Sequence, residues 1–185
     1  MPIVAVLDAN VLYPAPVRDF LLHIAFLSAY QPKWSNKIQE EWTRSLLAKR
    51  SNIRRASLAN TRKWMETVFP DALTPIDNTF KASIQLPDND DIHVVETAVS
   101  SGAKYIITFN LKDFPKESLS KYGIVAIHPD VFLCQLLDEM PNVVLEAFKN
   151  QVSMLKNPKK TPDEVLGALM RCGLPKTEKL LKRLI

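Results

Sequence analysis

The sequence has few of the residues from which several common kinds of site are built. Only four of its 185 residues are glycine, too few for a glycine-rich phosphate loop. The two cysteines, Cys134 and Cys172, have no metal-ligand spacing, and the three histidines, His23, His93 and His128, are scattered along the chain. No Ser, His or Cys arrangement suited to nucleophilic catalysis is evident. The sequence therefore gives no support for a glycine-rich phosphate loop, a Cys/His metal site or a Ser, His or Cys nucleophile.

Long hydrophobic runs are also absent. No apolar run approaches the roughly 18 residues that a membrane span requires, and the N-terminus lacks a signal-peptide pattern. The composition, 46% hydrophobic and 24% charged, is that of an ordinary globular protein. We therefore expect a cytoplasmic protein with reduced thiols and no membrane contact, built as one domain or one domain with an appendage.

An apolar run near the N-terminus is the most informative stretch of the chain. It reads IVAVLDANVL, and the acid Asp8 is followed two residues later by Asn10. A short apolar run bounded by polar residues is typical of a buried strand in a parallel sheet. Ligands bind at the carboxyl ends of such strands, so the pattern predicts that Asp8 lies at the mouth of a site.

Strand and helix patterns alternate over the first two thirds of the chain, which predicts an α/β fold with a parallel sheet and helices on both faces. The expected strands are Ile3–Leu7, Tyr105–Thr108 and Ile124–Ile127, with a short one near Leu73–Ile76. The segment Asn10–Pro16 is expected to be a turn. The expected helices are Val17–Ala29, a helix capped by Ser35 and running to Lys49, Ile53–Val68, and Asp91–Ser101, which Gly102 ends.

From Pro129 onward the pattern is helical, with breaks near Pro141, Asn157-Pro158 and Gly173-Leu174-Pro175. We therefore divide the chain into residues 1–128, the α/β part, and 129–185, a helical C-terminal extension. Apolar residues of the extension are expected to pack back onto the body, although they could instead serve a partner or a homodimer. They are Val165, Leu166, Leu169, Leu180, Leu181 and Leu184.

Three groups of acids could join Asp8. On the helix that Ser35 begins, Glu41 borders the apolar stripe of Ile38, Trp42 and Leu46, whereas Glu40 points outward. Surface pairing with Arg44 or Lys37 is an equally good interpretation of both glutamates.

The second group, Asp88, Asp90 and Asp91, precedes a helix. One acid there complements the helix dipole, but three are more negative charge than capping needs. Like charges this close together repel unless a cation holds them.

Asn110 and Asp113 follow the strand that ends at Thr108, at the same edge of the sheet as Asp8. Together the acids would make an all-oxygen cluster, which suits Mg²⁺ or Mn²⁺ and not zinc. One or two such ions can activate a water and stabilise the leaving oxygen of a phosphodiester.

Positive charge gathers in two places. Residues 149–185 hold nine Lys/Arg against three Asp/Glu, and residues 44–63 hold seven bases and no acid. For either run alone a solvated helix face is the simpler interpretation; beside an acidic site, the second run could follow the phosphate backbone of a substrate. Trp42 and Trp64 could stack bases, but core packing is the preferred interpretation of both. The candidate RNA-binding residues are Arg44, Lys49, Arg50, Arg54 and Arg55.

The ordered motifs LDANVL, PKWSNKIQEEW and LPDNDDIHVVETAVSSGAKYIITFNLKDFP resemble a PIN domain, and are most similar to bacterial toxins of the VapC type. The resemblance covers residues 3–128. It implies a three-layer α/β/α fold and a metal-dependent endoribonuclease, a hydrolase of phosphodiester bonds that uses Mg²⁺ or Mn²⁺ and acts on RNA. It also implies a cognate antitoxin partner.

Carried over by position, the resemblance implies four catalytic acids, Asp8, Glu41, Asp91 and Asp113. Asp8, Asp91 and Asp113 would hold the metal, and Glu41 would complete its surroundings or orient the water. Asn10, Asn110, Asp88 and Asp90 would support them. Position 110 is Asn where many members of the family have Asp.

Two other functions stay open from the sequence. The first is a non-catalytic RNA-binding or toxin–antitoxin scaffold with a degenerate PIN site. The second is a phosphotransferase with Asp8 as the nucleophile, for which the helper residues are not evident.

Overall fold

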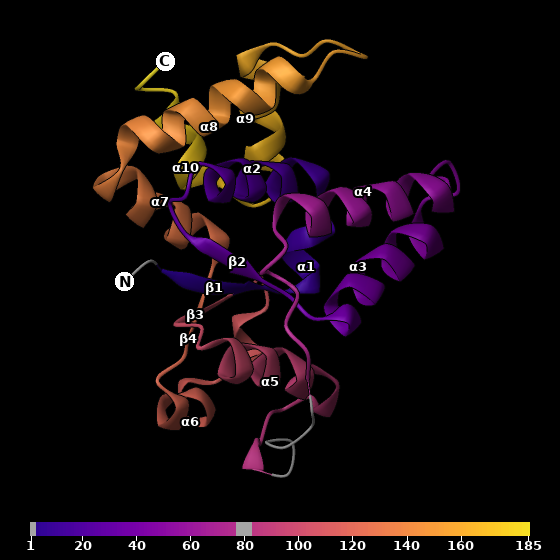
Figure 1. Ribbon diagram of the computed structural model, residues 1–185. Coiled ribbons are helices and arrows are strands. Elements are labelled where there is room, and N and C mark those ends of the chain that lie inside the picture. Colours follow the sequence, from indigo (N-terminus) through magenta and orange to yellow (C-terminus); the bar gives the residue numbers. More distant parts are fainter. Residues whose placement is uncertain (1–2, 77–82) are drawn as a thin grey trace.

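A parallel sheet of four short strands forms the centre of the molecule (Figure 1). The computed structural model describes residues 3–76 and 83–185. The strands follow the order β2-β1-β3-β4, and all neighbours are parallel. Their bounds are β1 Val4–Leu7, β2 Gln31–Lys33, β3 Tyr105–Ile107 and β4 Val125–Ile127.

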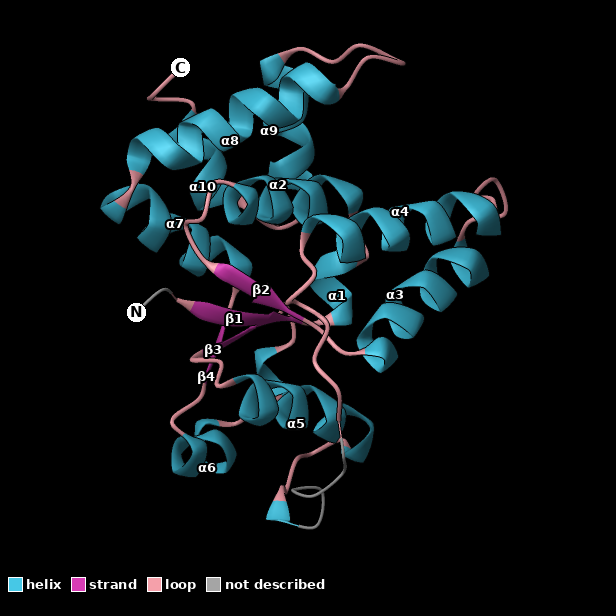
Figure 2. Ribbon diagram, in the orientation of Figure 1, coloured by secondary structure: helices cyan, strands magenta, loops and turns pink. Residues whose placement is uncertain are grey.

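Helices cover both faces of the sheet, which gives three layers (Figures 1 and 2). On one side lie α2, Ala15–Phe26, and α7, Pro129–Glu139; on the other lie α5, Ile92–Ser101, and α6, Lys116–Leu119. Helices α3, Asn36–Lys49, and α4, Arg55–Val68, project from the body as a hairpin. The predicted α/β/α architecture with a parallel sheet is confirmed.

Several local predictions hold. The Ser35 side chain accepts a hydrogen bond from the Ile38 N–H, at 3.3 Å, and begins α3 as an N-cap. Gly102 ends α5 with φ +64°, in the left-handed region that an L side chain rarely adopts. A 3-10 turn, Asn89–Asp91, precedes α5.

Three local predictions are wrong. The segment Asn10–Pro16, predicted as a turn, overlaps a short helix, α1 (Ala9–Leu12). Asp8 is the N-cap of this helix, and its side chain accepts a hydrogen bond from the Ala9 N–H. Strand β2 was not expected, since Gln-Pro-Lys has no apolar run. Near Leu73–Ile76 there is no strand, only an isolated bridge between Leu73 and Trp34. Residues 77–82, which follow this segment directly, lie outside the described residues.

The C-terminal segment is helical, as predicted. It contains α7, α8 (Pro141–Met154), α9 (Pro162–Arg171) and α10 (Pro175–Leu181). Each of these helices starts with proline, which is well suited to the first helical position because the N–H that it lacks would be unpaired there. None of the described helices has the length and apolar character to span a membrane.

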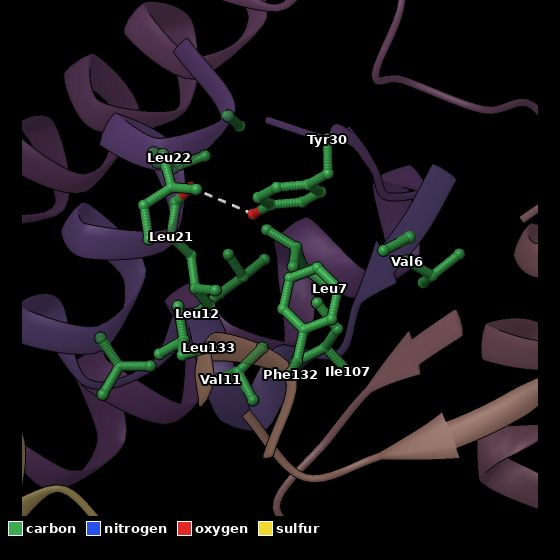
Figure 3. Close-up of a cluster of buried hydrophobic side chains, with 14 of the residues drawn as sticks. Val6, Leu7, Val11, Leu12, Leu21, Leu22, Tyr30, Ile107, Phe132 and Leu133 are labelled. Carbon is green, nitrogen blue, oxygen red and sulfur yellow. Dashed lines mark hydrogen bonds between the residues drawn. The ribbon is translucent and has the colours of Figure 1, made fainter. Parts of the chain in front are cut away.

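A continuous core joins the C-terminal segment to the α/β part. Leu7 of β1, Leu21 of α2 and Phe132 of α7 lie in one cluster, in which the Tyr30 hydroxyl donates to the Leu21 carbonyl at 3.1 Å (Figure 3). Of the apolar side chains expected to pack back, Leu180 is partly buried and Leu184 is 45% exposed. The remaining four are buried: Val165, Leu166, Leu169 and Leu181.

Candidate active site

Paired strands bring the ends of β1 and β3 to one point. Leu7 pairs with Ile107, so the next residues, Asp8 and Thr108, lie side by side at the carboxyl edge of the sheet. The Asp8 N–H donates to the Ile107 carbonyl at 3.1 Å, which continues the ladder by one step. The local register of the sheet therefore places Asp8 where the sequence predicted.

A cavity of about 410 Å³ opens at this edge, and we call it the acidic cavity. It receives side chains from four segments: the end of β1, helix α3, the start of α5 and the loop after β3. Asn10 and Asn110 line it, as do its charged residues, which are Asp8, Glu41, Asp91, Asp113, Arg44 and Lys49. The structure thus brings together the four acids that the sequence singled out.

Asp8 is held by a network of short hydrogen bonds. Its Oδ2 accepts from Asn10 Nδ2 at 2.7 Å and from the Thr108 hydroxyl at 2.8 Å. Thr108 Oγ1 accepts in turn from Asn10 Nδ2 at 2.8 Å and from the Asn110 N–H at 3.0 Å. Asn10 Oδ1 accepts from the Phe109 N–H at 3.0 Å, so the asparagine links the two strand ends. The network fixes the direction of one carboxylate relative to the cavity.

Burial and mutual repulsion work against the charges of this site. Burial raises the pKa of Asp8, which is 6% exposed, and the hydrogen bond from Thr108 opposes that rise. Partial burial raises the pKa of Asp91 to about 6, and the negative charges of Asp8, Asp113 and Asp88 add to the rise. Groups that resist ionisation in this way are typical of sites that a cation completes.

Glu41 has a partner that the sequence did not suggest. His93 Nε2, on α5, lies 2.9 Å from Glu41 Oε1, and the Lys37 ammonium lies 3.9 Å from the same oxygen. Glu40 is exposed and lines no part of the acidic cavity. The helical phase of α3 therefore separates the two glutamates as predicted.

The supporting residues divide into two groups. Asn110 donates from its side chain to Asp113 Oδ2, at the cavity. Asp88 instead caps the turn before α5, accepting from the Asp90 N–H at 2.9 Å, and neither Asp88 nor Asp90 lines the acidic cavity. Of this acidic run, only Asp91 reaches it.

The candidate RNA-binding residues are divided in the same way. Arg44 and Lys49 line the acidic cavity, while Arg50 lines a neighbouring one. Arg54 and Arg55 are exposed at the start of α4 and line neither. Of the two tryptophans, Trp42 is buried, as the preferred interpretation held, whereas Trp64 is 48% exposed.

Thr108 and His93 are the residues that sequence reasoning missed. A threonine that ends a strand has no distinguishing pattern, and only the register of β1 against β3 shows that its hydroxyl meets Asp8. His93 lies two residues after Asp91, so its helical position beside the acidic run was the available signal.

The donor set suits a hard divalent cation. The acids offer only oxygen, and Mg²⁺ is commonly held by one or two carboxylates, with water and substrate phosphate completing its shell. Within residues 3–76 and 83–185, no three His, Cys, Asp or Glu side chains are arranged to hold an ion as they stand. Several carboxylates could bind the same ion only if their side chains rotated toward the centre of the cavity.

Comparison with known proteins gave matches on both sides of Pro129. The family model described as the PIN domain matches residues 4–112, and that of the VapC50 C-terminal domain matches residues 129–183. A curated protein of Mycobacterium tuberculosis (strain ATCC 25618 / H37Rv), named "Putative ribonuclease VapC50", is 39% identical over 79 residues, or 43% of this chain. The match spans about half of that relative, 47% of its length. No solved structure matches the chain.

Proposed function

We propose that this chain, which belongs to the PIN-domain family, is a divalent-metal-dependent endoribonuclease that acts as the toxin of a toxin–antitoxin pair. The observation that carries the proposal is the gathering of Asp8, Glu41, Asp91 and Asp113 in one cavity beside Arg44 and Lys49. Acids suited to a cation and bases suited to phosphate lie together there, as hydrolysis of a phosphodiester requires.

Asp8, Asp91 and Asp113 would hold the Mg²⁺ or Mn²⁺. When bound, the ion neutralises charge on the scissile phosphate and lowers the pKa of a water, which makes that water a better nucleophile at neutral pH. The hydrogen bonds from Asn10 and Thr108 hold the Asp8 carboxylate in a fixed direction. Asn110 does the same for Asp113. Fixed ligands reduce the reorganisation needed during the reaction.

Glu41 is the residue that we assign to the attacking water. His93 Nε2 lies 2.9 Å from its Oε1, so Oε2 is left to accept a hydrogen bond from a water in the cavity. Arg44 and Lys49 would contact the phosphates on either side of the scissile bond, because their charges offset the repulsion between the acids and the RNA.

The partners belong to the same proposal. We assign RNA as the substrate and a cognate antitoxin protein as the inhibitor, both acting in the cytoplasm; self-association into a homodimer stays a prediction. A non-catalytic scaffold is the second candidate function. Asn110 favours this second function, because its amide supplies one negative charge fewer for holding a metal than an aspartate at that position would.

Replacing Asp8 with asparagine tests the proposal. Asp8→Asn keeps the size of the side chain and removes its charge, and RNA cleavage with Mn²⁺ should fall by about a thousandfold or more, since an ionic ligand contributes several kcal/mol to the transition state. The matched control is Asp90→Asn, which lies outside the acidic cavity and should cleave like the wild type. Undiminished cleavage by Asp8→Asn would refute the assignment.

Metal titration separates the two candidate functions. A nuclease site should bind Mn²⁺ and raise the unfolding temperature of the wild type but not that of Asp8→Asn. If RNA binds while Mn²⁺ has no effect on either protein, the scaffold function is the correct one.

A further inference from the structure

A second cavity adjoins the acidic cavity, and the C-terminal segment forms part of its wall. It has a volume of about 350 Å³ and lies between α3 and the end of α9. Tyr13 lines both cavities, and the Lys49 ammonium lies 5.6 Å from the centre of its ring. We call it the basic cavity, because its charged lining residues are Arg18, Arg50 and Arg171.

We propose that the basic cavity binds the RNA backbone next to the scissile phosphate, and that Arg171 of the C-terminal segment contacts a phosphate there. This inference rests on the proposed function, and it assigns part of the substrate site to the helical segment that follows the PIN domain.

The contrast in charge between the two cavities is the first support. The acidic cavity has four acids and two bases, a formal charge of −2, whereas the basic cavity has three bases and no acid. A polyanion that reaches the acids must therefore gain its binding energy from cations nearby, and the adjoining cavity supplies them.

Two of these arginines are available to a ligand. Arg18 is buried and pairs with Asp19 at 3.0 Å. Arg50 and Arg171 are exposed, and in the described part of the chain neither has a carboxylate within ion-pair distance. Leu46 and Ile53 give the cavity an apolar floor, which can contact a sugar while the arginines reach the phosphate.

The turn that follows Arg171 packs close to the acidic site. Gly173 has φ +92°, and a Cβ added there would lie 3.2 Å from Phe109 Cε1. The Phe109 N–H is itself bonded to Asn10 in the acidic site. The turn between α9 and α10 therefore packs directly against the loop that carries Asn110 and Asp113.

Arg50, Arg171 and Cys172 all line the basic cavity. The two exposed arginines therefore border one space, although Arg50 follows the last residue of α3 and Arg171 ends α9. In keeping with this, burial raises the pKa of the Cys172 thiol, and the positive charges of Arg171 and Arg50 oppose that rise. A single phosphate between them would be contacted from both parts of the chain.

The test compares RNA oligomers of two lengths on the full chain. Binding is measured in the Asp8→Asn background, so that the RNA stays intact. A dinucleotide without terminal phosphates carries only the scissile phosphate, which belongs to the acidic cavity, whereas a twelve-nucleotide strand also reaches the basic cavity. Arg171→Gln should weaken binding of the long RNA by about three- to tenfold, and should reduce the slope of log K against log salt by about 0.7 to 1, while binding of the dinucleotide is unaffected.

Control variants make the result specific. Lys179→Gln removes an exposed base of α10 that lines neither cavity, and it should not change binding. Arg50→Gln should weaken binding of the long RNA by about as much as Arg171→Gln does. The double variant should lose less than the product of the two effects if one phosphate is shared. Thermal unfolding of each variant is followed in parallel.

Several outcomes would overturn the inference. They are unchanged binding of the long RNA by Arg171→Gln, an equal loss of affinity for the dinucleotide, and an equal loss of affinity in Lys179→Gln. Another is a loss of affinity for an acidic peptide with RNA binding unchanged, which would make the cavity a protein site. Cleavage by the otherwise wild-type chain is scored separately: cleavage with no effect of Arg171 refutes this inference alone, and RNA binding that depends on Arg171 without any cleavage refutes only the nuclease function.

Discussion

Asp8 and Asp130 are both buried, at 6% and 4% exposed, and each accepts hydrogen bonds from backbone N–H groups and a threonine hydroxyl. Asp8 lies at the edge of the sheet with other acids around it. Asp130 lies on α7, where its Oδ1 accepts from the Thr177 N–H at 2.8 Å and the Thr177 hydroxyl at 2.7 Å. Its Oδ2 accepts from the Lys176 N–H at 3.1 Å.

The surroundings of Asp130 stabilise its negative charge, whereas those of Asp8 include further negative charges. The N-terminus of α10 has no cap from its own sequence, so Asp130 supplies one from another helix and meets the positive end of the helix dipole. Asp8 instead shares its cavity with three further acids, one of which, Glu41, raises its pKa. Both carboxylates cap a helix, since Asp8 begins α1, but only Asp8 lies among other acids. The comparison indicates that Asp130, whose partners are all donors, stabilises the fold, whereas the acids around Asp8 repel one another unless a cation binds.

The largest effect on stability is expected at Asp130. Asp130→Ala leaves the buried Thr177 N–H, the partly buried Lys176 N–H and the Thr177 hydroxyl without their acceptor, and should lower the free energy of unfolding by about 3 kcal/mol. Chemical denaturation measures the change. Cleavage per folded molecule should be kept, since Asp130 does not line the acidic cavity.

Asparagine at the two positions gives the sharpest contrast. Asp130→Asn should cost about 1 to 2 kcal/mol, because its amide group faces N–H donors, while Asp8→Asn should change stability by less than about 1 kcal/mol because it also removes a disfavoured charge. If Asp8→Asn were the less stable of the two, our distinction between a structural and a functional aspartate would fail.

The sequence was sufficient for the parts of the fold that depend on local patterns. The run Ile3–Leu7 and the Ser35 cap placed β1 and α3, and the position of acids at strand ends pointed to the acids that line the acidic cavity. Strand β2 could not be seen, because a three-residue strand that contains Pro32 owes its place to pairing with β1. Helix α1 was taken for a turn, because one helical turn between an aspartate and two prolines shows no periodicity.

Contacts between distant segments explain the rest of what the sequence did not reveal. The hydroxyl of Thr108 meets Asp8 across 100 positions, and Asp130 meets Thr177 across 47. The approach of Gly173 to Phe109 likewise depends on how α9 and α10 pack. Such pairs follow from the assembled core, so only the structure shows that the helical segment packs against Phe109, next to the loop that lines the acidic cavity.

Thr108→Val is the next test, because it removes support from Asp8 without touching its charge. The valine has nearly the same shape, but Asp8 loses a donor and the Asn110 N–H loses its acceptor. The rate of cleavage should fall by about ten- to a hundredfold, as is typical when a residue that orients a metal ligand is lost.

Thr97→Val is the matched control for that variant. Thr97 is fully buried on α5, and its hydroxyl donates to the His93 carbonyl at 2.7 Å. Both variants should lose about 1 to 2 kcal/mol of stability, but only Thr108→Val should lose activity. Equal activity in the two variants would show that Thr108 acts on folding alone.

The smallest expected effect concerns the charge on Asp91. Its pKa is raised from 3.8 to about 6, chiefly by burial and then by Asp8, Asp113 and Asp88. Between these two pH values the folded state binds more protons than the unfolded state. Without metal, the contribution of Asp91 to the free energy of unfolding therefore falls as the pH rises through that range, and the penalty is complete above pH 6.

Asp91→Asn removes this penalty. In EDTA at pH 7.5 the variant should be more stable than the wild type by about 1 kcal/mol, less than the full shift implies because solvent screens the partly exposed side chain. Near pH 4 the difference should vanish. Mn²⁺ should reverse the order at pH 7.5, since only the wild type gains its full binding energy. If the wild type were instead more stable than Asp91→Asn in EDTA at pH 7.5, the negative charges around Asp8 would already be compensated within the protein, as the charge of Asp130 is by the N-terminus of α10.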